Sequence, residues 1–388
     1  MVAAAPYDAP MSSRAVVVPP HVARPLRLLP FRALMLPPAR GPRGTVERAL
    51  GRPGARVEEL LARWAAEGRL THDDTPGLYL HEYTTAGITV RGLVGALDVS
   101  RRAEDPAEQA VLPHEGVHCD QVTQLADRMG HMEVDPAPIL LVHRGPARLR
   151  ELLADVRRSE PIATFTDHTQ QQHRLWALRD REQLEAVEEA LARARVLIAD
   201  GHHRYAAYLA LQGAHPGGGR NTGLAMLVDQ DDTPLFLGPI HRVLPGTSLE
   251  SLTSAARSAG VDFAYVARRD ALAALGPSAV VATDGRQWAV LAVASTTDRA
   301  AVEILHEDLL PARRGTPPPV EYRHTVEAAL ADARPGRALA VLMPAVDLDL
   351  VTRIATTGRL LPEKATSFQP KPTPGLLIRS LRDAPVGR

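Results

Sequence analysis

The chain contains 388 residues, of which 45% are hydrophobic, and its 45 basic residues balance 45 acidic residues to a formal net charge of zero. This length predicts about two or three packed domains, and the neutral charge argues against a general nucleic-acid-binding protein, which normally carries a basic surplus. The single cysteine, Cys119, excludes an internal disulfide, and no apolar run approaches the roughly 20 residues of a membrane span, so we expect a cytoplasmic protein without membrane or nucleic-acid partners.

The first hundred residues predict a tail, a helix and a pair of strands. Residues 1–25 lack the basic start and sustained apolar core of a signal peptide, and we interpret them as a flexible tail. Ordered structure is expected from Leu26 onward. Val57 and Trp64 share one face of an amphipathic helix, and the alternating pattern over 77–99 is typical of paired strands.

Further along the chain, helical and strand patterns alternate. Apolar periodicity predicts helices over 119–129, over 181–195 and from 202 onward, strands over 137–143 and 196–200, and a hairpin over 222–244. The composition changes after Pro245. We therefore expect a fold of the α/β class, as a mixed α+β arrangement, with a tail over 1–25, an N-terminal region over 26–245 and a C-terminal α/β region over 246–388.

The stretch "VLIADGHHR" combines a buried strand with a polar helix start. Asp200 or Gly201 can cap the following helix, whose first amides and dipole favour a bound anion. Gly201 allows close approach of a phosphate, Arg204 can grip its oxygens, and His202 and His203 supply further donors. Asp200 can orient a histidine or hold magnesium. The alternative interpretation is a helix cap with surface histidines.

The stretch "LPHEGVHCDQV" contains a second candidate site. His114, Glu115 and His118 match the H-E-x-x-H spacing of zinc peptidases, in which both histidines bind the metal and the glutamate is the base. A proline before the motif and a glycine inside it favour a loop instead of an apolar helix. We therefore expect no zinc, and we keep a surface carboxylate as the alternative for Glu115.

Two lysines and a His-Arg pair complete the candidates. Lys364 and Lys371 lie in the proline-rich "PEKATSFQPKP", where a restricted backbone can hold a lysine in place to neutralise phosphoryl charge. The alternative is a solvated tail. His241 and Arg242 in "PIHRVL" are interpreted as structural residues or as pocket-lining residues.

The "DGHHR" element after an apolar strand resembles the phosphate-binding signature of the ParB/sulfiredoxin superfamily, which includes partitioning CTPases, sulfiredoxins and kinases of free serine. The chain as a whole resembles the bacterial and archaeal family called domain of unknown function 1015. One difference is that "LMLPPARGPRG" replaces the Pro-Tyr-Asp-Val segment usual in that family. The resemblance is carried by "PFRAL" at 30–34, "LPHE" at 112–115, "ADGHHR" at 199–204, "IHRVLP" at 240–245 and "LPEKATSFQPKPTPGLLIRSL" at 361–381.

The resemblance implies a ParB/sulfiredoxin-like core followed by a C-terminal α/β domain. Sulfiredoxin chemistry would need a cysteine where this chain has His202, and the motif is most similar to that of the free-serine kinases. The implied activity is a small-molecule kinase that uses magnesium with ATP or ADP and acts on free serine or a similar hydroxy amino acid. Alternatives are a nucleotide or phosphoester hydrolase at the same site, a zinc peptidase, and a nucleotide-binding protein without turnover.

The kinase hypothesis gives each candidate residue a role, and the role of Glu115 is the one that the resemblance implies. Glu115 and His203 are expected to be catalytic, with Glu115 as the base on the substrate hydroxyl. Asp200 is also the candidate magnesium ligand. The expected phosphate-binding residues are Asp200, Gly201, His202, His203 and Arg204, and the expected pocket residues are His114, His241, Arg242, Lys364 and Lys371.

Overall fold

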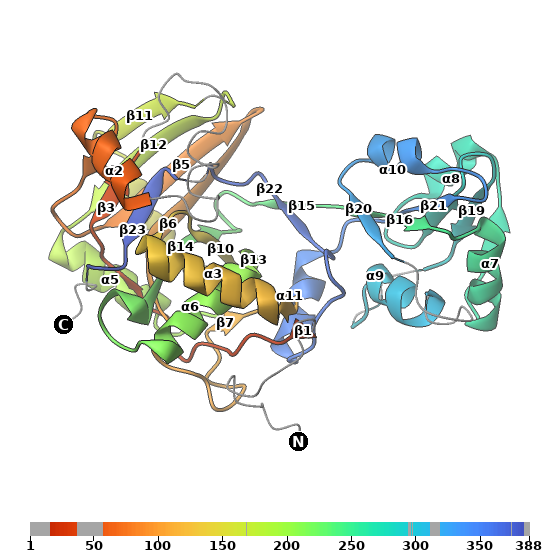
Figure 1. Cartoon of the computed structure of the whole chain (residues 1–388), viewed down its shortest axis with the longest axis horizontal. Coiled ribbons are helices and arrows are strands. Elements are labelled where there is room, and N and C mark those ends of the chain that lie inside the picture. The colour runs from red at the N-terminus through yellow and green to blue at the C-terminus, as the bar shows by residue number, and fades with distance from the viewer. Residues whose placement is uncertain are drawn as a thin grey trace. The chain divides into compact units, whose positions relative to one another are not determined.

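The computed structural model describes residues 16–36, 57–167, 169–293, 296, 298–310, 319–373 and 375–383. The chain forms two compact units (Figure 1). The first unit extends to Leu235 and resumes at Pro370, and the second comprises Phe236–Gln369. The mixed α+β class is confirmed. The division differs from the expected boundary after residue 245, because the last part of the chain returns to the first unit.

The first unit is built on a mixed sheet. Strands β10 and β14 are parallel, as are β13 and β7, and the remaining neighbours are antiparallel. In spatial order the described strands are β11 (Ala163–Thr166), β12 (Gln172–Leu178), β5 (Leu78–Thr85), β6 (Ile88–Asp98), β14 (Thr222–Asp229), β10 (Ile139–His143), β13 (Val196–Asp200) and β7 (Val111–Leu112), with β2 (Leu28–Leu29) also paired to β6.

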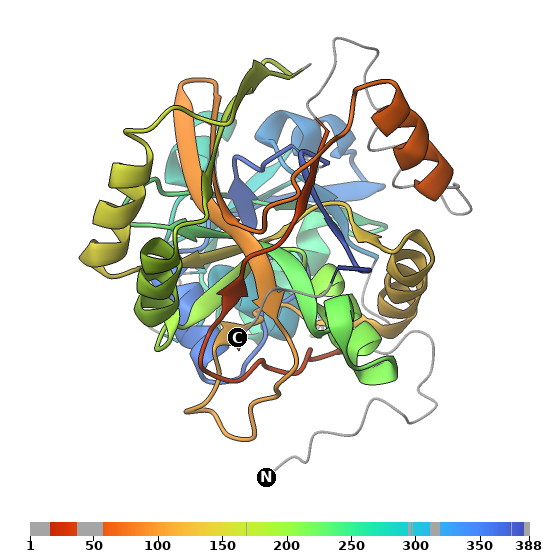
Figure 2. The same cartoon turned by 90° about the vertical axis from the view of Figure 1, so that its left-hand side faces the viewer.

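Helices cover both faces of this sheet. Helices α3 (Cys119–Met132) and α6 (His202–Ala214) lie on one side, and α4 (Ala147–Val156) and α5 (Arg181–Leu191) lie on the other (Figure 2). Helix α2 (Val57–Ala66) and the short turn η1 (Gly218–Asn221) complete the unit. The helix expected over 119–129 is confirmed, and the one expected over 181–195 forms but ends at Leu191. In both, apolar residues recur every three or four positions and are buried. No helix among the described residues is long and apolar enough to cross a membrane.

Two small sheets tie the chain ends to this unit. One contains β4 (Thr71–His72), β3 (Ala33–Met35), β23 (Leu377–Ser380) and β9 (Val134–Asp135), and the other contains β1 (Val16–Val17) and β8 (Val117–His118). The expected tail over 1–25 lies outside the described residues up to position 15. From residue 16 the structure differs from that expectation, because β1 pairs with β8 and Val22 is buried.

The second unit contains an antiparallel sheet with helices packed on it. Its apolar core includes Val281, Trp288 and Leu342. The strands are, in spatial order, β17 (Phe263–Tyr265), β19 (Trp288–Leu291), β18 (Val280–Thr283), β21 (Ala338–Leu342), β16 (His241–Pro245) and β20 (Glu321–Arg323), with β15 (Phe236–Gly238) and β22 (Ser367–Gln369) as a separate pair. The helices are α7 (Leu249–Ser258), α8 (Arg268–Ala274), α9 (Ala301–Glu303), η2 (Ile304–Leu309), α10 (Val326–Asp332) and α11 (Leu348–Thr356).

The hairpin expected over residues 222–244 is wrong. Strand β14 pairs with β6 and β10 in the first unit, whereas β16 pairs with β20 and β21 in the second. The chain does turn after β14, where the Asp232 amide donates to the Asp229 carbonyl. It then continues into the other unit, a path that local turn residues do not specify.

The start of β14 offers a direct test of packing in the first unit. A Cβ atom on Gly223 would lie 2.1 Å from the ring of Tyr208, which is fully buried on α6. We expect Gly223→Ala to destabilise the protein by about 1–3 kcal/mol, because the rigid ring has no room to move. The control is Gly213→Ala at an exposed position of α6 with no neighbouring atom within 4 Å. That change should stabilise slightly. Urea unfolding compares the two, and equal midpoints would contradict the close packing.

Candidate functional site

The junction of β13 and α6 has the backbone geometry expected of an anion site. Strand β13 ends at Asp200, and Gly201 is the N-cap of α6 with φ +97°. This left-handed conformation favours glycine because a Cβ atom would be strained. A Cβ there would also lie 2.9 Å from Ile139. Gly201 has no side chain with which to cap the helix start.

The Arg204 side chain makes its hydrogen bonds within the protein. Its Nη1 donates to the carbonyl of Ala137 at 3.0 Å and to that of Pro138 at 2.6 Å, and its Nη2 donates to Asp200 Oδ2 at 2.8 Å. The guanidinium lies so close to Gly201 that a Cβ there would be 3.0 Å from Nη2. These contacts change the interpretation of Arg204: it positions the end of β13, instead of standing free to grip a phosphate.

Lys371 supplies an exposed positive charge at the same junction. Its Nζ lies 2.5 Å from Asp200 Oδ1, although the two residues are 171 positions apart. The side chains are 48% and 31% exposed, so the pair faces solvent. Burial alone would raise the pKa of the Asp200 carboxyl, but the charges and hydrogen bonds of Arg204 and Lys371 hold that pKa below its usual value. Asp200 is therefore a carboxylate that holds an ammonium group beside the helix start.

The composition of the chain sets its two lysines apart from its other basic residues. The chain has 45 basic residues and only two of them, Lys364 and Lys371, are lysines. The other cationic positions are arginines, whose planar guanidinium differs in shape and hydration from the compact lysine ammonium. The rarity of lysine singles out both residues, and the structure distinguishes them, because Lys371 lies on Asp200 in the first unit whereas Lys364 belongs to the second unit.

The two histidine motifs come together in the structure. The backbone amide of His114 donates to Nε2 of His202 at 3.3 Å, and that of His118 donates to Nε2 of His203 at 3.1 Å. The rings of His114 and His202 meet edge to face with centroids 4.5 Å apart, while those of His118 and His203 stack at 5.9 Å. Two histidines of α6 therefore hold the segment that contains Glu115 against the start of the helix.

Burial limits what two of these histidines can do. His114 is fully buried, and burial lowers its pKa to about 3, against a smaller opposing effect from a hydrogen bond with the Ile198 backbone. It is therefore neutral at physiological pH. His202 is also buried, and its Nε2 accepts a backbone proton. The structure thus gives His202 a packing role, in place of the expected role as an exposed phosphate donor.

Glu115 lies on this docked segment, with its side chain 15% exposed and an oxygen 4.0 Å from His114 Nε2. The H-E-x-x-H residues do not lie on a helix, since β8 ends at His118 and α3 begins at Cys119. The rings of His114 and His118 instead contact two different histidines. In the described part of the chain no group of three or more His, Cys, Asp or Glu side chains is arranged to hold a metal.

Asp200 does not fit its expected role as a magnesium ligand. One carboxylate oxygen accepts from Lys371 and the other from Arg204. A divalent cation there would have to displace an ion pair and would stand beside two positive charges, which is electrostatically unfavourable. We therefore assign Asp200 to positioning Lys371 and assign no metal to this carboxylate.

The other expected pocket residues belong to the second unit. His241 and Arg242 lie in β16 and are each only 1% exposed. His241 Nδ1 accepts from the Met343 amide at 3.1 Å, and Arg242 Nη2 donates to the Lys364 carbonyl at 2.9 Å. Burial, together with the charge of Arg242, lowers the pKa of His241 to about 4. Both residues hold the second unit together, and the exposed Lys364 sits at a turn with φ 56°.

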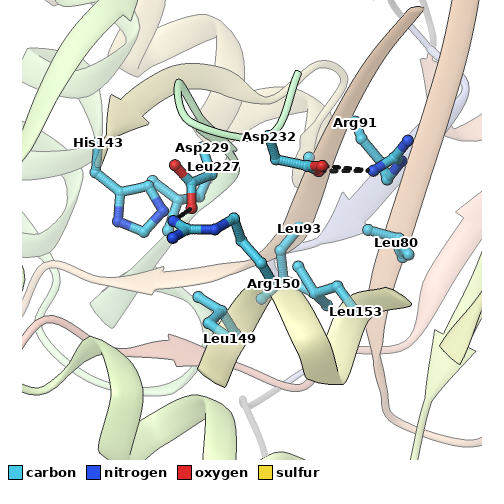
Figure 3. A pocket seen from close by; sticks show the side chains of 11 residues that line it. Leu80, Arg91, Leu93, His143, Leu149, Arg150, Leu153, Leu227, Asp229 and Asp232 are labelled. Atoms are coloured by element: carbon cyan, nitrogen blue, oxygen red, sulfur yellow. Dashed lines mark hydrogen bonds and ion pairs between the residues drawn. The ribbon is translucent and has the colours of Figure 1, made fainter. Parts of the chain in front are cut away.

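A separate recess lies at the carboxyl ends of β10 and β14 (Figure 3). It holds none of the residues expected from the sequence, and Asp200 pairs with the other half of β10. Its charges neutralise one another: Arg150 Nη1 lies 2.9 Å from Asp229 Oδ2, and Arg91 Nη1 lies 2.7 Å from Asp232 Oδ2. We interpret the ion pairs of this recess as structural, because they join α4 and β6 to the end of β14 and to the loop that follows it.

Comparisons with known proteins place the chain in a family. A family model described as "Protein of unknown function (DUF1015)" matches residues 2–310. No curated protein matches the chain. Similar solved structures include a variant of free serine kinase in complex with ADP (13% identity, 67% of this chain and 84% of that chain, TM-score 0.38). A conserved hypothetical protein from Pyrococcus furiosus has 14% identity over 71% of this chain and 93% of its own, with TM-score 0.40. SbnI with a C-terminal truncation, from Staphylococcus aureus, has 11% identity over 76% of this chain and 87% of its own, with TM-score 0.41.

Proposed function

The chain belongs to the DUF1015 family of proteins of unknown function, and from the residues of its own site we propose that it is a small-molecule phosphotransferase. It transfers a phosphoryl group from a nucleotide, ATP or ADP, to the hydroxyl of a small molecule. Free serine or a similar hydroxy amino acid is the first acceptor to test. We place this activity in the cytoplasm, where nucleotides and free amino acids are available.

One observation carries the proposal: the Lys371 ammonium is held by Asp200 at the start of α6, where the N-cap residue is glycine. Helix-start amides and a neighbouring cation together bind phosphate oxygens and stabilise charge on a phosphoryl group in transfer. Gly201 supplies the positive φ that this junction requires, and Ile139 and Arg204 fill the space on its Cβ side. Phosphoryl transfer depends mainly on such positioning and charge, and requires little other chemistry from the protein.

Glu115 and His203 are the proposed proton-handling groups. Glu115 follows His114, whose amide is bonded to the first residue of α6, and its side chain is only partly exposed. A carboxylate in that position accepts the proton that a substrate hydroxyl loses as the phosphoryl group arrives. His203 stands one residue into the helix and keeps the segment of Glu115 in place through the His118 amide.

Two alternatives use the same geometry. Water in place of the acceptor hydroxyl would make the protein a nucleotide or phosphoester hydrolase, and binding without turnover would make it a nucleotide sensor. The experiment incubates the purified protein with ATP or ADP, magnesium and free serine, and follows phosphoserine, inorganic phosphate and nucleotide separately. Phosphoserine supports the kinase, and phosphate alone supports the hydrolase. Bound but unchanged nucleotide leaves only the sensor, and the absence of any phosphorylated amino acid with both donors would refute the kinase.

We expect Glu115→Gln to slow phosphoryl transfer by about 10²-fold, the lower end of the range for a general base, because water reaches a partly exposed position. Nucleotide affinity should remain near that of the unchanged protein, since the helix amides and Lys371 are untouched. Initial rates and equilibrium nucleotide binding measure the two effects separately. The matched control is Glu188→Gln, which removes the exposed partner of Arg27 and should alter neither. Equal turnover in both variants would show that Glu115 is only a surface carboxylate.

A further inference from the structure

The segment that carries Lys371 is tied down on both sides of the lysine. On one side, the buried Tyr83 hydroxyl donates to the Pro370 carbonyl at 2.7 Å. On the other, the Thr373 hydroxyl lies 2.5 Å from Asp167 Oδ2 and 3.1 Å from Gln171 Oε1. Gln171 Nε2 also reaches the Lys371 carbonyl at 3.4 Å. We name Tyr83, Asp167, Gln171 and Thr373 the segment clamp.

Two buried histidines are hydrogen-bonded one after the other to Asp167 of the segment clamp. His173 Nε2 lies 3.3 Å from Asp167 Oδ2, and His81 Nε2 lies 3.0 Å from His173 Nδ1. All three side chains are at most 3% exposed. Burial lowers the pKa of His81 to about 3 and also lowers that of His173, against the opposing pull of Asp167. Both rings are therefore neutral, and the pattern assigns each a proton on Nε2, so that His81 donates to His173 and His173 donates to Asp167.

Asp167 is the charged centre of this arrangement. Its Oδ1 accepts hydrogen bonds from the backbone amides of Thr169 and Gln171, and its Oδ2 accepts from the side chains of His173 and Thr373. Burial would raise the pKa of Asp167, but the hydrogen bonds from Thr373, Thr169 and the neighbouring groups lower it to about 2. A buried carboxylate with this many donors is costly to disturb, so it provides a rigid anchor for Thr373.

We propose that the segment clamp, supported by His81 and His173, is the device that positions the Lys371 ammonium on Asp200. The Lys371 side chain is about half exposed and has a flexible four-carbon stem. One ion pair at the surface would therefore hold its ammonium group only weakly. The clamp fixes the backbone on both sides of Lys371. Only the side chain then loses conformational entropy when the ammonium group binds Asp200. Its members are positioning residues that do not touch the reacting groups.

The test measures the accessibility of the lysine amines in the full-length protein. Because the chain has only two lysines, trace acetylation followed by mass spectrometry reports the rate at Lys371 against Lys364 as an internal reference. The Lys371 amine must leave Asp200 before it can react. Thr373→Val removes the hydroxyl at nearly constant shape, and we expect it to raise the Lys371/Lys364 labelling ratio by about tenfold, the factor for losing one hydrogen bond to a charged group.

Two further variants separate positioning from general loosening. Thr373→Ser retains the hydroxyl and should restore the original ratio, whereas Tyr83→Phe removes the other anchor and should raise it as well. Thermal unfolding checks that each variant is folded. A ratio unchanged in both Thr373→Val and Tyr83→Phe overturns the proposal, as does a ratio that rises equally in Thr373→Val and Thr373→Ser.

The consequence for turnover rests on the proposed phosphotransferase function, but the labelling ratio does not. If the protein transfers phosphate, Thr373→Val should lower kcat with little change in the KM for the acceptor, and Thr373→Ser should recover kcat. If labelling responds as expected while no transfer occurs, the clamp stands and the proposed function fails. If transfer occurs and the labelling ratio stays constant, the function stands and the clamp fails.

Discussion

Replacing Lys371 with alanine should reduce phosphoryl transfer by about 10²–10³-fold, the usual loss when one preorganised donor to a developing charge is removed. The change deletes the exposed cation at the start of α6 and leaves Asp200 paired only with Arg204. The fold should be unaffected, because the side chain is half exposed and its backbone is held by other groups. Initial rates with saturating nucleotide measure the effect, and circular dichroism checks the fold.

Lys364 is the matched control for this experiment. It is the one other lysine of the chain, is only seven positions away, and has an exposed side chain in the second unit. We expect Lys364→Ala to retain nearly full activity. Lys371→Arg adds a further comparison, because it keeps the charge but changes its shape and hydration, and it should recover only part of the lost rate. If Lys364→Ala and Lys371→Ala behave alike, the ammonium on Asp200 has no part in transfer.

Replacing Arg379 with methionine should lower the free energy of unfolding by about 3–5 kcal/mol, the cost of leaving one partner of a buried ion pair uncompensated. Arg379 is 2% exposed and donates from Nη2 and Nε to Asp135 Oδ2, at 2.6 and 2.9 Å. It also donates to the Gly219 carbonyl at 2.9 Å and to the Thr222 carbonyl at 2.7 Å. Without Arg379, the buried Asp135 carboxylate and the two carbonyl groups lose this donor. The loss occurs at β23, in the part of the chain that returns to the first unit.

The control for this prediction lies three residues further along the chain. Arg382 pairs with Glu133, but its side chain is 59% exposed, so Arg382→Met should cost less than about 1 kcal/mol. Urea unfolding compares the two variants, and amide hydrogen exchange should show lost protection in β14 and β23, with the second unit unchanged. A double variant with Asp135→Leu should recover part of the loss, because it removes the stranded charge. Equal midpoints for the two arginine variants would contradict the buried-pair argument.

The sequence alone determined the elements whose chemistry is local. Helix α5 follows from apolar residues at helical spacing, and it begins after Asp180, whose side chain accepts from two helix amides. The junction at Gly201 is likewise local, because a strand, a glycine with positive φ and a helix start all lie within a few residues. Class, main elements and the central motif could therefore be predicted from composition and spacing.

Only the tertiary structure decided which residues share the site. Asp200 meets Lys371 across 171 positions, and His114 meets His202 across 88. Lys364 lies beside Lys371 in the sequence but belongs to the other unit. Such pairings depend on the path of the whole chain, which crosses from the first unit to the second and back, and local spacing carries no record of it. For the same reason the role of Arg204 could not be predicted, since the carbonyls at positions 137 and 138 that bind it come from the segment before β10.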